Sequence, residues 1–314
     1  MGDDPLARRG ERRREAVIDA LSPRRSLWRC LSVTNIGRIR PLFPVTLECR
    51  WGSCPDAFGS HRAVVFPPSL PVPFWSIPRV REPELMDDPA IAEADHLRAL
   101  VALGRINTLS LTAARLAAGV VALAGGQEDR GAGLEVVDVA SGGGDVTIDL
   151  ARRLRGASRW RSVAITGIDI SPRAIERSQD LAARFGSPAT FLLRDVTAQG
   201  CPSCDVAVSS LFLHHLDDDD ARQLLRAMAS AARRGIVISD LIRSPAGLFL
   251  AFFATFFLTG SGVARVDGPR SVRAARTPAE YRALLESVGL RGATVRRVWP
   301  ERVSIVWRAE GEDR

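Results

Sequence analysis

The chain has 314 residues, with 43 basic residues, all of them arginine, against 36 acidic ones, and a formal net charge of +7. The excess is concentrated in residues 1–85, which carry a net charge of +5, whereas residues 86–314 carry only +2. A basic surface that follows a phosphate backbone along the whole chain is therefore disfavoured, and so is nucleic acid as a partner.

The rest of the composition is that of an ordinary globular protein, with 46% hydrophobic and 25% charged residues. Five cysteines provide no disulfide framework in a chain of this length and fit a reducing compartment. The longest apolar run, residues 246–258, is shorter than the roughly 20 residues that a membrane-spanning helix needs. We therefore expect a cytoplasmic protein without a membrane span.

Proline divides the chain into regions. Residues 1–85 contain 11 of the 19 prolines, and proline interrupts both helices and central strands. We predict a poorly ordered extension rich in arginine and proline over residues 1–85, a helical cap over 86–130 and the main domain over 131–314. Two alternatives remain for the extension: it is a partner-binding arm, or the native chain begins at Met86, where regular patterning starts.

After Met86 the apolar residues recur at helical spacing over residues 90–124, and breaks near Gly104 and Gly119 indicate two helices. Short apolar runs then alternate with amphipathic segments. Strands are predicted at 134–140, 163–170, 190–193, 205–211 and 236–240, and helices at 146–155, 172–185 and 218–232. A last helix at 278–288 precedes two strands, 293–299 and 302–307. The pattern predicts an α/β fold whose mostly parallel sheet ends in an antiparallel hairpin.

The strongest motif is a glycine-rich turn directly after the first predicted strand. Gly142 and Gly144 allow the backbone to turn sharply and to approach a ligand closely. Such a loop cradles nucleotide cofactors in doubly wound folds. The dinucleotide fingerprint needs a third glycine where this chain has Thr147, so a nicotinamide cofactor fits the loop less well.

Two carboxylates accompany this turn at the ends of the next two strands. Asp169 ends the second strand, where a carboxylate can accept both hydroxyls of an adenosine ribose. Asp195 follows the third strand, where it can accept a hydrogen bond from an adenine amino group. Either residue alone could simply cap a turn, but three elements at three successive strand ends indicate a shared ligand site at the carboxyl edge of the sheet.

These motifs resemble those of the class I S-adenosylmethionine-dependent methyltransferases. The segment 138–144 is similar to the family's first motif, with Ala140 where many members have glycine. Residues 167–172, 194–196 and 205–216 are similar to the second, third and fourth-strand motifs. The resemblance covers residues 134–308, and within the family it extends to bacterial enzymes that tailor quinones and polyketides.

The resemblance implies a seven-stranded sheet, S-adenosylmethionine as the cofactor, and methyl transfer to a small molecule, which we expect to be aromatic or lipophilic and methylated at oxygen. The cofactor-binding residues that it implies are Asp138, Ala140, Ser141, Gly142, Gly144, Asp169, Ile170, Asp195, Val196 and Ser210.

His214 and His215 lie just past the fourth strand, where acceptors approach the cofactor in this family. An imidazole at this position suits a general base at neutral pH, so both residues are candidate catalytic residues. The alternative is a histidine with a structural role. No third ligand at a defensible spacing accompanies the pair, and no metal site is predicted. The four acidic residues 217–220 are expected to begin a helix, favoured by its dipole.

Phenylalanines recur on one face of a helix that follows the fifth strand. Phe249, Phe252, Phe253 and Phe256 are interpreted as the lid of the acceptor site, and contact with a membrane surface is also open. Because the other face is apolar too, the alternative is a helix buried in the core. Arg265, Arg270, Arg273 and Arg276 are expected in a solvated loop.

Three other functions remain open. The basic residues of the extension would suit an RNA methyltransferase, and the glycine-rich loop would suit a nicotinamide-dependent oxidoreductase. The motifs alone also allow a non-catalytic module that binds S-adenosylmethionine. The sequence leaves the acceptor and the oligomeric state undetermined.

Overall fold

The computed structural model describes residues 77–88, 90–126, 131–157 and 159–309. They all belong to one compact unit that spans Pro68–Arg314. The expected disorder of the first 76 residues lies outside the described residues.

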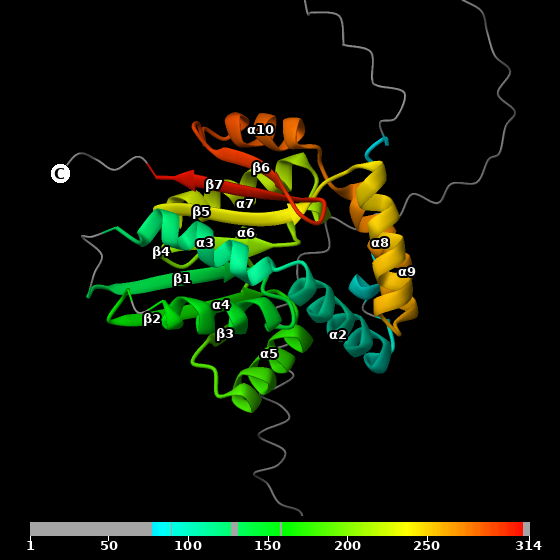
Figure 1. The fold of residues 1–314 in the computed structure, drawn as a ribbon, viewed down its shortest axis with the longest axis horizontal. Helices are drawn as coiled ribbons and strands as arrows, with labels where there is room; N and C mark the ends of the chain where they lie inside the picture. The colour runs from blue at the N-terminus through cyan, green and yellow to red at the C-terminus, as the bar shows by residue number, and fades with distance from the viewer. Residues whose placement is uncertain (1–76, 89, 127–130, 158, 310–314) are drawn as a thin grey trace, which may run out of the picture. The chain divides into compact units, whose positions relative to one another are not determined.

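Seven strands form a single sheet in the order β3-β2-β1-β4-β5-β7-β6 (Figure 1). Strands β1 to β5 are parallel, and β7 is antiparallel to both β5 and β6. The strands are β1 (Gly133–Val139), β2 (Ser162–Asp169), β3 (Thr190–Leu193), β4 (Cys204–Ser210), β5 (Ala232–Leu241), β6 (Thr294–Val298) and β7 (Arg302–Arg308). The predicted fold class, including the antiparallel closure, is confirmed.

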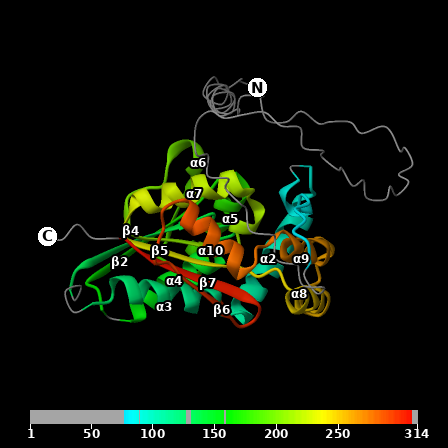
Figure 2. The ribbon, with the colours of Figure 1, turned by 90° about the horizontal axis from the view of Figure 1, so that it is seen from above.

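Helices cover both faces of this sheet, and each face has its own apolar core (Figure 2). One face packs against α3 (Thr112–Ala124), α4 (Asp145–Gly156) and α5 (Pro172–Phe185). The other packs against α6 (Val196–Gln199), α7 (Asp218–Ala231) and α10 (Pro278–Ser287). Burial of this kind on both sides explains why the central strands read as continuous apolar runs.

The break between the first two helices is not at the glycines. Helix α2 (Glu93–Leu109) and α3 are separated at Ser110 and Leu111, and Leu111 has a positive φ of 55°. Gly104 and Gly119 lie inside the helices. At both positions a neighbouring element packs so closely that there is no room for a side chain. A Cβ on Gly119 would lie 2.5 Å from Val237 of β5, and one on Gly104 would lie 2.8 Å from Asp145.

The two helices of the expected cap have different positions. Helix α3 belongs to the layer on the sheet, where Leu116, Val120 and Leu123 are buried. Helix α2 packs with α8 (Pro245–Leu258) and α9 (Gly262–Ala274) at the end of the sheet where the parallel strands finish (Figure 1). The expectation of a loop with solvated arginines is wrong for α9, since the chain stays helical there despite Pro269.

The chain is already packed on the domain before residue 86, the predicted boundary. The Val80 N–H donates to the Arg273 carbonyl at 3.1 Å, and the Arg79 Nε donates to the Ala274 carbonyl at 2.8 Å. The backbone N–H groups of Leu85 and Met86 donate to the carboxylate of Asp267, at 2.8 and 3.0 Å. Residues 77–85 therefore form part of the domain. Their proline-rich composition gave no indication of this, because these contacts are with residues far away in the sequence.

Among the described residues, no single helix has the length and apolarity to cross a membrane, although the pair α2 and α3, bent by 57°, satisfies both conditions together.

Candidate functional site

The glycine-rich loop connects the end of β1 to the start of α4. Three of its residues have positive φ angles: Ala140 at 57°, Gly142 at 53° and Gly144 at 80°. Ala140 thus adopts a backbone conformation that favours glycine. A Cβ on Gly142 would meet no described atom within 4 Å, so the loop borders open space at the position where a cofactor has to approach the backbone.

Asp169 at the end of β2 is tied to this loop. Its Oδ2 accepts from the Gly142 N–H at 2.8 Å, and its Oδ1 accepts from the Ser171 N–H at 2.9 Å. Burial raises the pKa of Asp169, while the hydrogen bonds from Ser171 and Gly142 oppose that rise. Each carboxylate oxygen can accept a second hydrogen bond, as two neighbouring ribose hydroxyls would require. The next residue, Ile170, is 67% exposed and offers an apolar surface beside the carboxylate.

The structure gives Asp195 a capping role at the third strand end. Its Oδ1 accepts from the backbone N–H of Thr197 at 2.9 Å and of Ala198 at 3.2 Å, which begins α6. The described residues make no hydrogen bond to its Oδ2, so a ligand amino group could still bind there. Val196 is buried in the core, whereas Ser210 is half-buried at the end of β4.

Asp138 supports the loop from inside the protein. It is fully buried, and its Oδ2 accepts from the Thr147 hydroxyl at 2.6 Å. Burial raises its pKa to about 7, together with the charge of Asp169 and against the bond from Thr147. Its Oδ1 and the Ser141 Oγ are buried without a partner among the described groups. Orphaned polar atoms under an open glycine loop fit a site that is completed by a polar ligand.

The two histidines lie one strand further along the same edge of the sheet. The short helix η2 (Leu213–His215) follows β4, and it is held by Asp240 near the end of β5. The Asp240 Oδ2 accepts from the His214 backbone N–H at 3.0 Å, and the Oδ1 lies 2.6 Å from the His214 Nδ1. Both side chains are buried. With Asp240 ionised, this pairing places the ring proton on Nδ1 and directs the Nε2 lone pair to the opposite side.

Glu84, from the segment that precedes α2, faces both imidazoles. Its Oε1 lies 3.8 Å from the Nε2 of His214 and 3.8 Å from the Nε2 of His215. The two rings are tilted against each other, with centroids 4.3 Å apart. The Nδ1 of His215 lies 3.5 Å from the Oδ2 of Asp87. Glu84, His214 and His215 thus bring one carboxylate and two imidazoles to a common point, with ligand atoms within 4.8 Å of one another.

This surrounding charge changes the ionisation of His215. Burial by itself lowers the pKa of the imidazole, but the contact with Asp87 and the charges of Glu84, Asp87 and Asp240 outweigh it and raise the pKa to about 9. Burial by itself raises the pKa of Asp240, but His214, the Leu241 N–H and His215 together outweigh burial and lower it. The cluster is therefore a strongly negative environment that favours a bound cation or proton.

A buried arginine fixes the position of the histidine segment. Arg276 donates to the Leu213 carbonyl at 2.7 Å, to the Leu216 carbonyl at 3.1 Å and to the Asp218 carboxylate at 2.7 Å. Asp217 caps α7 by accepting from the N–H groups of the next turn. The acidic run thus begins a helix, as predicted, and Arg276 lies in the interior instead of in solvent.

Sequence reasoning missed Asp240, Glu84, Asp87 and Arg276 as members of this cluster. Asp240 could have been found, because it ends a predicted strand beside the one that precedes the histidines. No local pattern indicated that Glu84 belongs to the cluster, since it lies in a proline-rich stretch some 130 residues before its partners.

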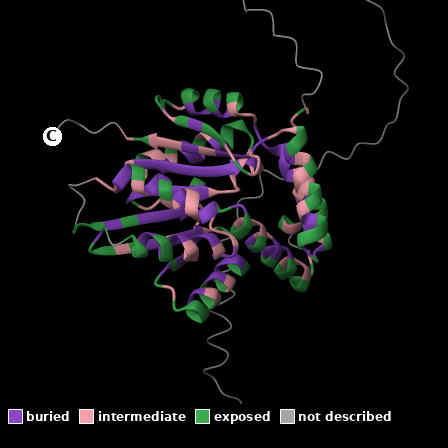
Figure 3. Ribbon diagram, in the orientation of Figure 1, coloured by how far each residue is buried: buried purple, intermediate pink, exposed green. Residues whose placement is uncertain are grey.

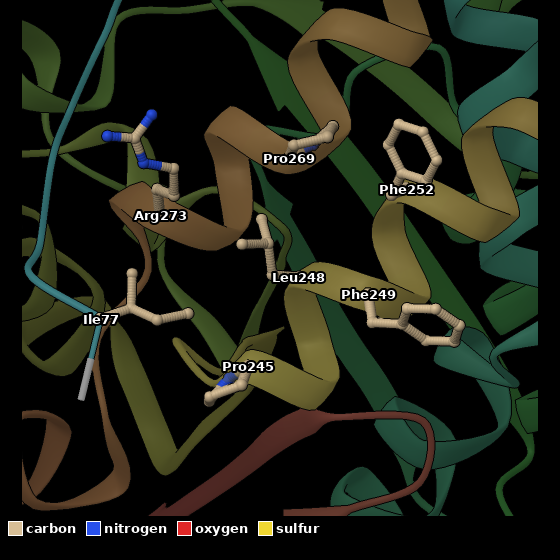
Figure 4. Close-up of a pocket in the computed structure, with 7 residues that line it drawn as sticks. All are labelled: Ile77, Pro245, Leu248, Phe249, Phe252, Pro269 and Arg273. Carbon is tan, nitrogen blue, oxygen red and sulfur yellow. The ribbon is translucent and has the colours of Figure 1, made fainter. Parts of the chain in front are cut away.

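The phenylalanines of α8 are exposed, and the interpretation of α8 as a buried helix is wrong. Their exposed fractions range from 48% to 71%, and Figure 3 shows exposed and half-buried residues along most of α8. An open apolar hollow lies beside them (Figure 4), lined by Phe249 and Phe252 of α8, Pro269 and Arg273 of α9, and Ile77, with Pro245 and Leu248. No residue of the glycine-rich loop lines it. The role of Phe253 and Phe256 as lid residues stays a prediction.

Comparison with known proteins agrees with this architecture. Residues 136–235 match the family model described as a methyltransferase domain. The structure of the plantazolicin methyltransferase BpumL in complex with SAH is similar with a TM-score of 0.50 and 14% identity, covering 70% of this chain and 97% of that one. That likeness concerns the fold alone.

Two further solved structures are more distant in shape. Magnesium protoporphyrin IX methyltransferase from Synechocystis PCC 6803, with bound SAH, is 20% identical with a TM-score of 0.43, over 64% of this chain and 83% of that one. Human N-acetylserotonin methyltransferase in complex with SAM is 17% identical with a TM-score of 0.49, over 69% of this chain and 57% of that one. No curated protein sequence matches the chain.

Proposed function

We propose that this chain, which is a class I S-adenosylmethionine-dependent methyltransferase, transfers the methyl group to an oxygen atom of a small aromatic or lipophilic acceptor. The observation that carries this proposal is the cluster of His214, Asp240 and Glu84 beside the ends of β4 and β5. It places groups that can take up a proton at the edge of the sheet that also bears the glycine-rich loop.

The cofactor would lie along the ends of β1, β2 and β3. Asp169 would accept hydrogen bonds from the ribose hydroxyls, Asp195 would accept a hydrogen bond from the adenine amino group, and Ile170 would pack against the adenine ring. The loop from Ala140 to Gly144 would hold the remaining polar part of the cofactor by its backbone. When bound, S-adenosylmethionine supplies an activated methyl group on a sulfonium.

The protein then has to align the acceptor, exclude water and remove the hydroxyl proton. His214 and His215 are the proposed catalytic residues, with Glu84 beside both. His214 would take up this proton, whereas His215, whose pKa is raised to about 9, would be a cation that stabilises the charge developing on the acceptor oxygen. Asp240 would act by orienting His214. Asp87 connects the two halves of the site, because its carboxylate contacts His215 and its charge also raises the pKa of Asp169.

A small apolar acceptor is supported by the helices around this edge. Helix α2 packs with α8 and α9 at the end of the sheet, and an open apolar hollow lies beside α8 and α9. The exposed phenylalanines of α8 would contact the lipophilic part of such an acceptor.

Calorimetry with S-adenosylmethionine and with NADH tests the cofactor. We expect binding of the first only, and we expect Asp169→Asn to weaken it by about tenfold or more, because a hydrogen bond to a charged group contributes roughly 1.5–3 kcal/mol. Asp149→Asn, on the exposed side of α4, is the matched control. Binding of NADH in place of S-adenosylmethionine would overturn the proposal.

Incubation with labelled S-adenosylmethionine and a panel of phenols, quinols, amines and RNA tests the acceptor. Label on the hydroxyl compounds supports the proposal. Label only on amines or on RNA, or binding of S-adenosylmethionine with no acceptor labelled, would refute it in favour of another methyltransferase or a non-catalytic module.

A further inference from the structure

We propose that Glu84, His214 and His215 form a binding site for a divalent transition-metal ion such as Zn²⁺. The three side chains come from two parts of the chain and converge with their ligand atoms within 4.8 Å of one another. Two imidazoles and one carboxylate are a common ligand set for zinc in sites that keep one coordination position open. The role of that open position in methyl transfer rests on the proposed function, whereas the metal site itself does not.

The orientation of both rings is the first argument. A histidine that binds a metal by one ring nitrogen usually donates its other N–H to a carboxylate, which fixes the ring and raises its basicity. His214 has this arrangement, since its Nδ1 lies 2.6 Å from Asp240 while its Nε2 faces Glu84. His215 repeats it, with its Nδ1 3.5 Å from Asp87 and its Nε2 facing the same Glu84 oxygen. Two independent carboxylates thus direct two Nε2 atoms to one point.

Charge and burial are the second argument. Three carboxylates, from Glu84, Asp87 and Asp240, surround two imidazoles that are neutral when they act as ligands. Glu84 and His214 are buried, and the side chain of His215 is 23% exposed. The carboxylate of Asp87 is 60% exposed, so the buried negative charge is that of Glu84 and Asp240. Two buried carboxylates beside the imidazoles are stabilised by a dication more than exposed acidic groups are.

The spacing fits an ion only after the three ligand atoms, which lie within 4.8 Å of one another, move closer together. Bonds of about 2.0–2.1 Å in a tetrahedral arrangement place neighbouring ligand atoms roughly 3.3 Å apart. The two distances of 3.8 Å from Glu84 to the imidazoles therefore have to shorten by a few tenths of an ångström. Glu84 can supply part of the movement, because it lies in an extended segment directly before the short helix η1 (Leu85–Asp87). Its Oε1, which also accepts from the Ser271 hydroxyl, would exchange that hydrogen bond for the ion.

The metal would deepen the proposed function by defining the acceptor. With both imidazoles bound to the ion, His214 would no longer act as the base. An acceptor hydroxyl in the open position would instead become more acidic, as water does on a catalytic zinc ion, and would release its proton to solvent before its oxygen attacks the methyl group. This arrangement favours phenols or enols that can offer an oxygen to the ion over acceptors that lack one.

Titration of the full, chelator-treated chain, without a polyhistidine tag, tests the site. We expect isothermal calorimetry with Zn²⁺ to give one site per chain, and Co²⁺ to give the visible absorption bands of a four- or five-coordinate ion. The variants Glu84→Gln and His215→Asn should each weaken Zn²⁺ binding by about 10- to 100-fold or more. Asp219→Asn, which changes an exposed carboxylate that pairs with Arg222, should leave it unchanged.

The second variant keeps the test decisive if the first fails to fold, and circular dichroism reports the fold of each. Absence of Zn²⁺ and Co²⁺ binding would overturn the proposal. So would unchanged binding in both variants, since the ion would then be held elsewhere, for example by the free cysteines Cys201 and Cys204. Methyl transfer to a phenol by a chain that binds no ion would overturn the metal site and leave the proposed function standing.

Discussion

Asp240 holds His214 by two contacts at once: one carboxylate oxygen accepts from the backbone N–H at 3.0 Å, and the other lies 2.6 Å from the ring Nδ1. The residues are neighbours because β4 and β5 are paired in parallel, so that the segment after β4 passes the end of β5. The same aspartate thus fixes both the backbone and the ring of the proposed catalytic histidine.

Replacing Asp240 by asparagine should therefore reduce turnover more than binding. The amide keeps the size of the side chain but no longer fixes the proton on Nδ1, so His214 can adopt the wrong tautomer. We expect kcat to fall on the order of 10²-fold, within the range that positioned acid–base groups contribute. The dissociation constant for S-adenosylmethionine should stay unchanged. A kcat equal to that of the wild type would show that the pair is only structural.

Asp138 should make the stability of the fold depend on pH. Its pKa is about 7 in the folded chain against 3.8 without burial, so between these values the folded state holds a proton that the unfolded chain has lost. The free energy of unfolding should consequently fall as the pH rises from about 4 to 7, by up to roughly 1.4 kcal/mol per unit from this group.

The variant Asp138→Asn removes this contribution and keeps the shape of the side chain. Urea unfolding of both proteins at pH 5 and pH 7.5 measures the difference, and other carboxylates cancel because they are present in both. We expect the variant to lose less stability between the two pH values. An equal loss in both proteins would mean that Asp138 is ionised in the folded state.

Two deletions distinguish the extension from the domain. Removing residues 1–76 spares every described contact, whereas removing residues 1–85 also deletes Arg79 and Glu84. Arg79 donates to the carbonyls of Ala274 and Leu216, and Glu84 faces both proposed catalytic histidines. We expect the longer deletion to have the lower melting temperature and the lower turnover.

The same two deletions also test separately whether the extension serves an RNA methyltransferase and whether Glu84 contributes to the site. Loss of activity on RNA with the shorter deletion would favour a nucleic-acid-binding arm. Identical turnover of the two truncated proteins on a phenol would contradict the assignment of Glu84 to the site.

Because the phenylalanines of α8 are exposed, replacing them should weaken binding of the acceptor and have little effect on the stability of the fold. In the double variant Phe252→Ala and Phe256→Ala, the KM for a lipophilic acceptor should rise by about tenfold, because burying one aromatic ring contributes roughly 1.5–3 kcal/mol. The melting temperature and the affinity for S-adenosylmethionine should change little. Phe185→Ala, another exposed phenylalanine at the end of α5, is the matched control. An unchanged KM would show that this face does not contact the acceptor.

Local sequence patterns were sufficient to predict the order of the strands and the residues of the proposed cofactor half of the site. A strand has a local apolar pattern, and parallel strands in a doubly wound sheet place their carboxyl ends at one edge. Asp169 and the glycine-rich loop could therefore be brought together without knowing any distance, and the hydrogen bond from Gly142 to Asp169 agrees with that expectation.

Long-range packing determines the other half of the proposed site. Glu84 meets His214 and His215 across about 130 residues, and Arg276 becomes buried because its guanidinium group satisfies the carbonyls of the histidine segment. The phenylalanines of α8 are exposed although their sequence is compatible with a core helix. In each case the burial and the partners of a residue depend on which distant element packs against its segment. Local patterns of charge and apolarity do not specify that element.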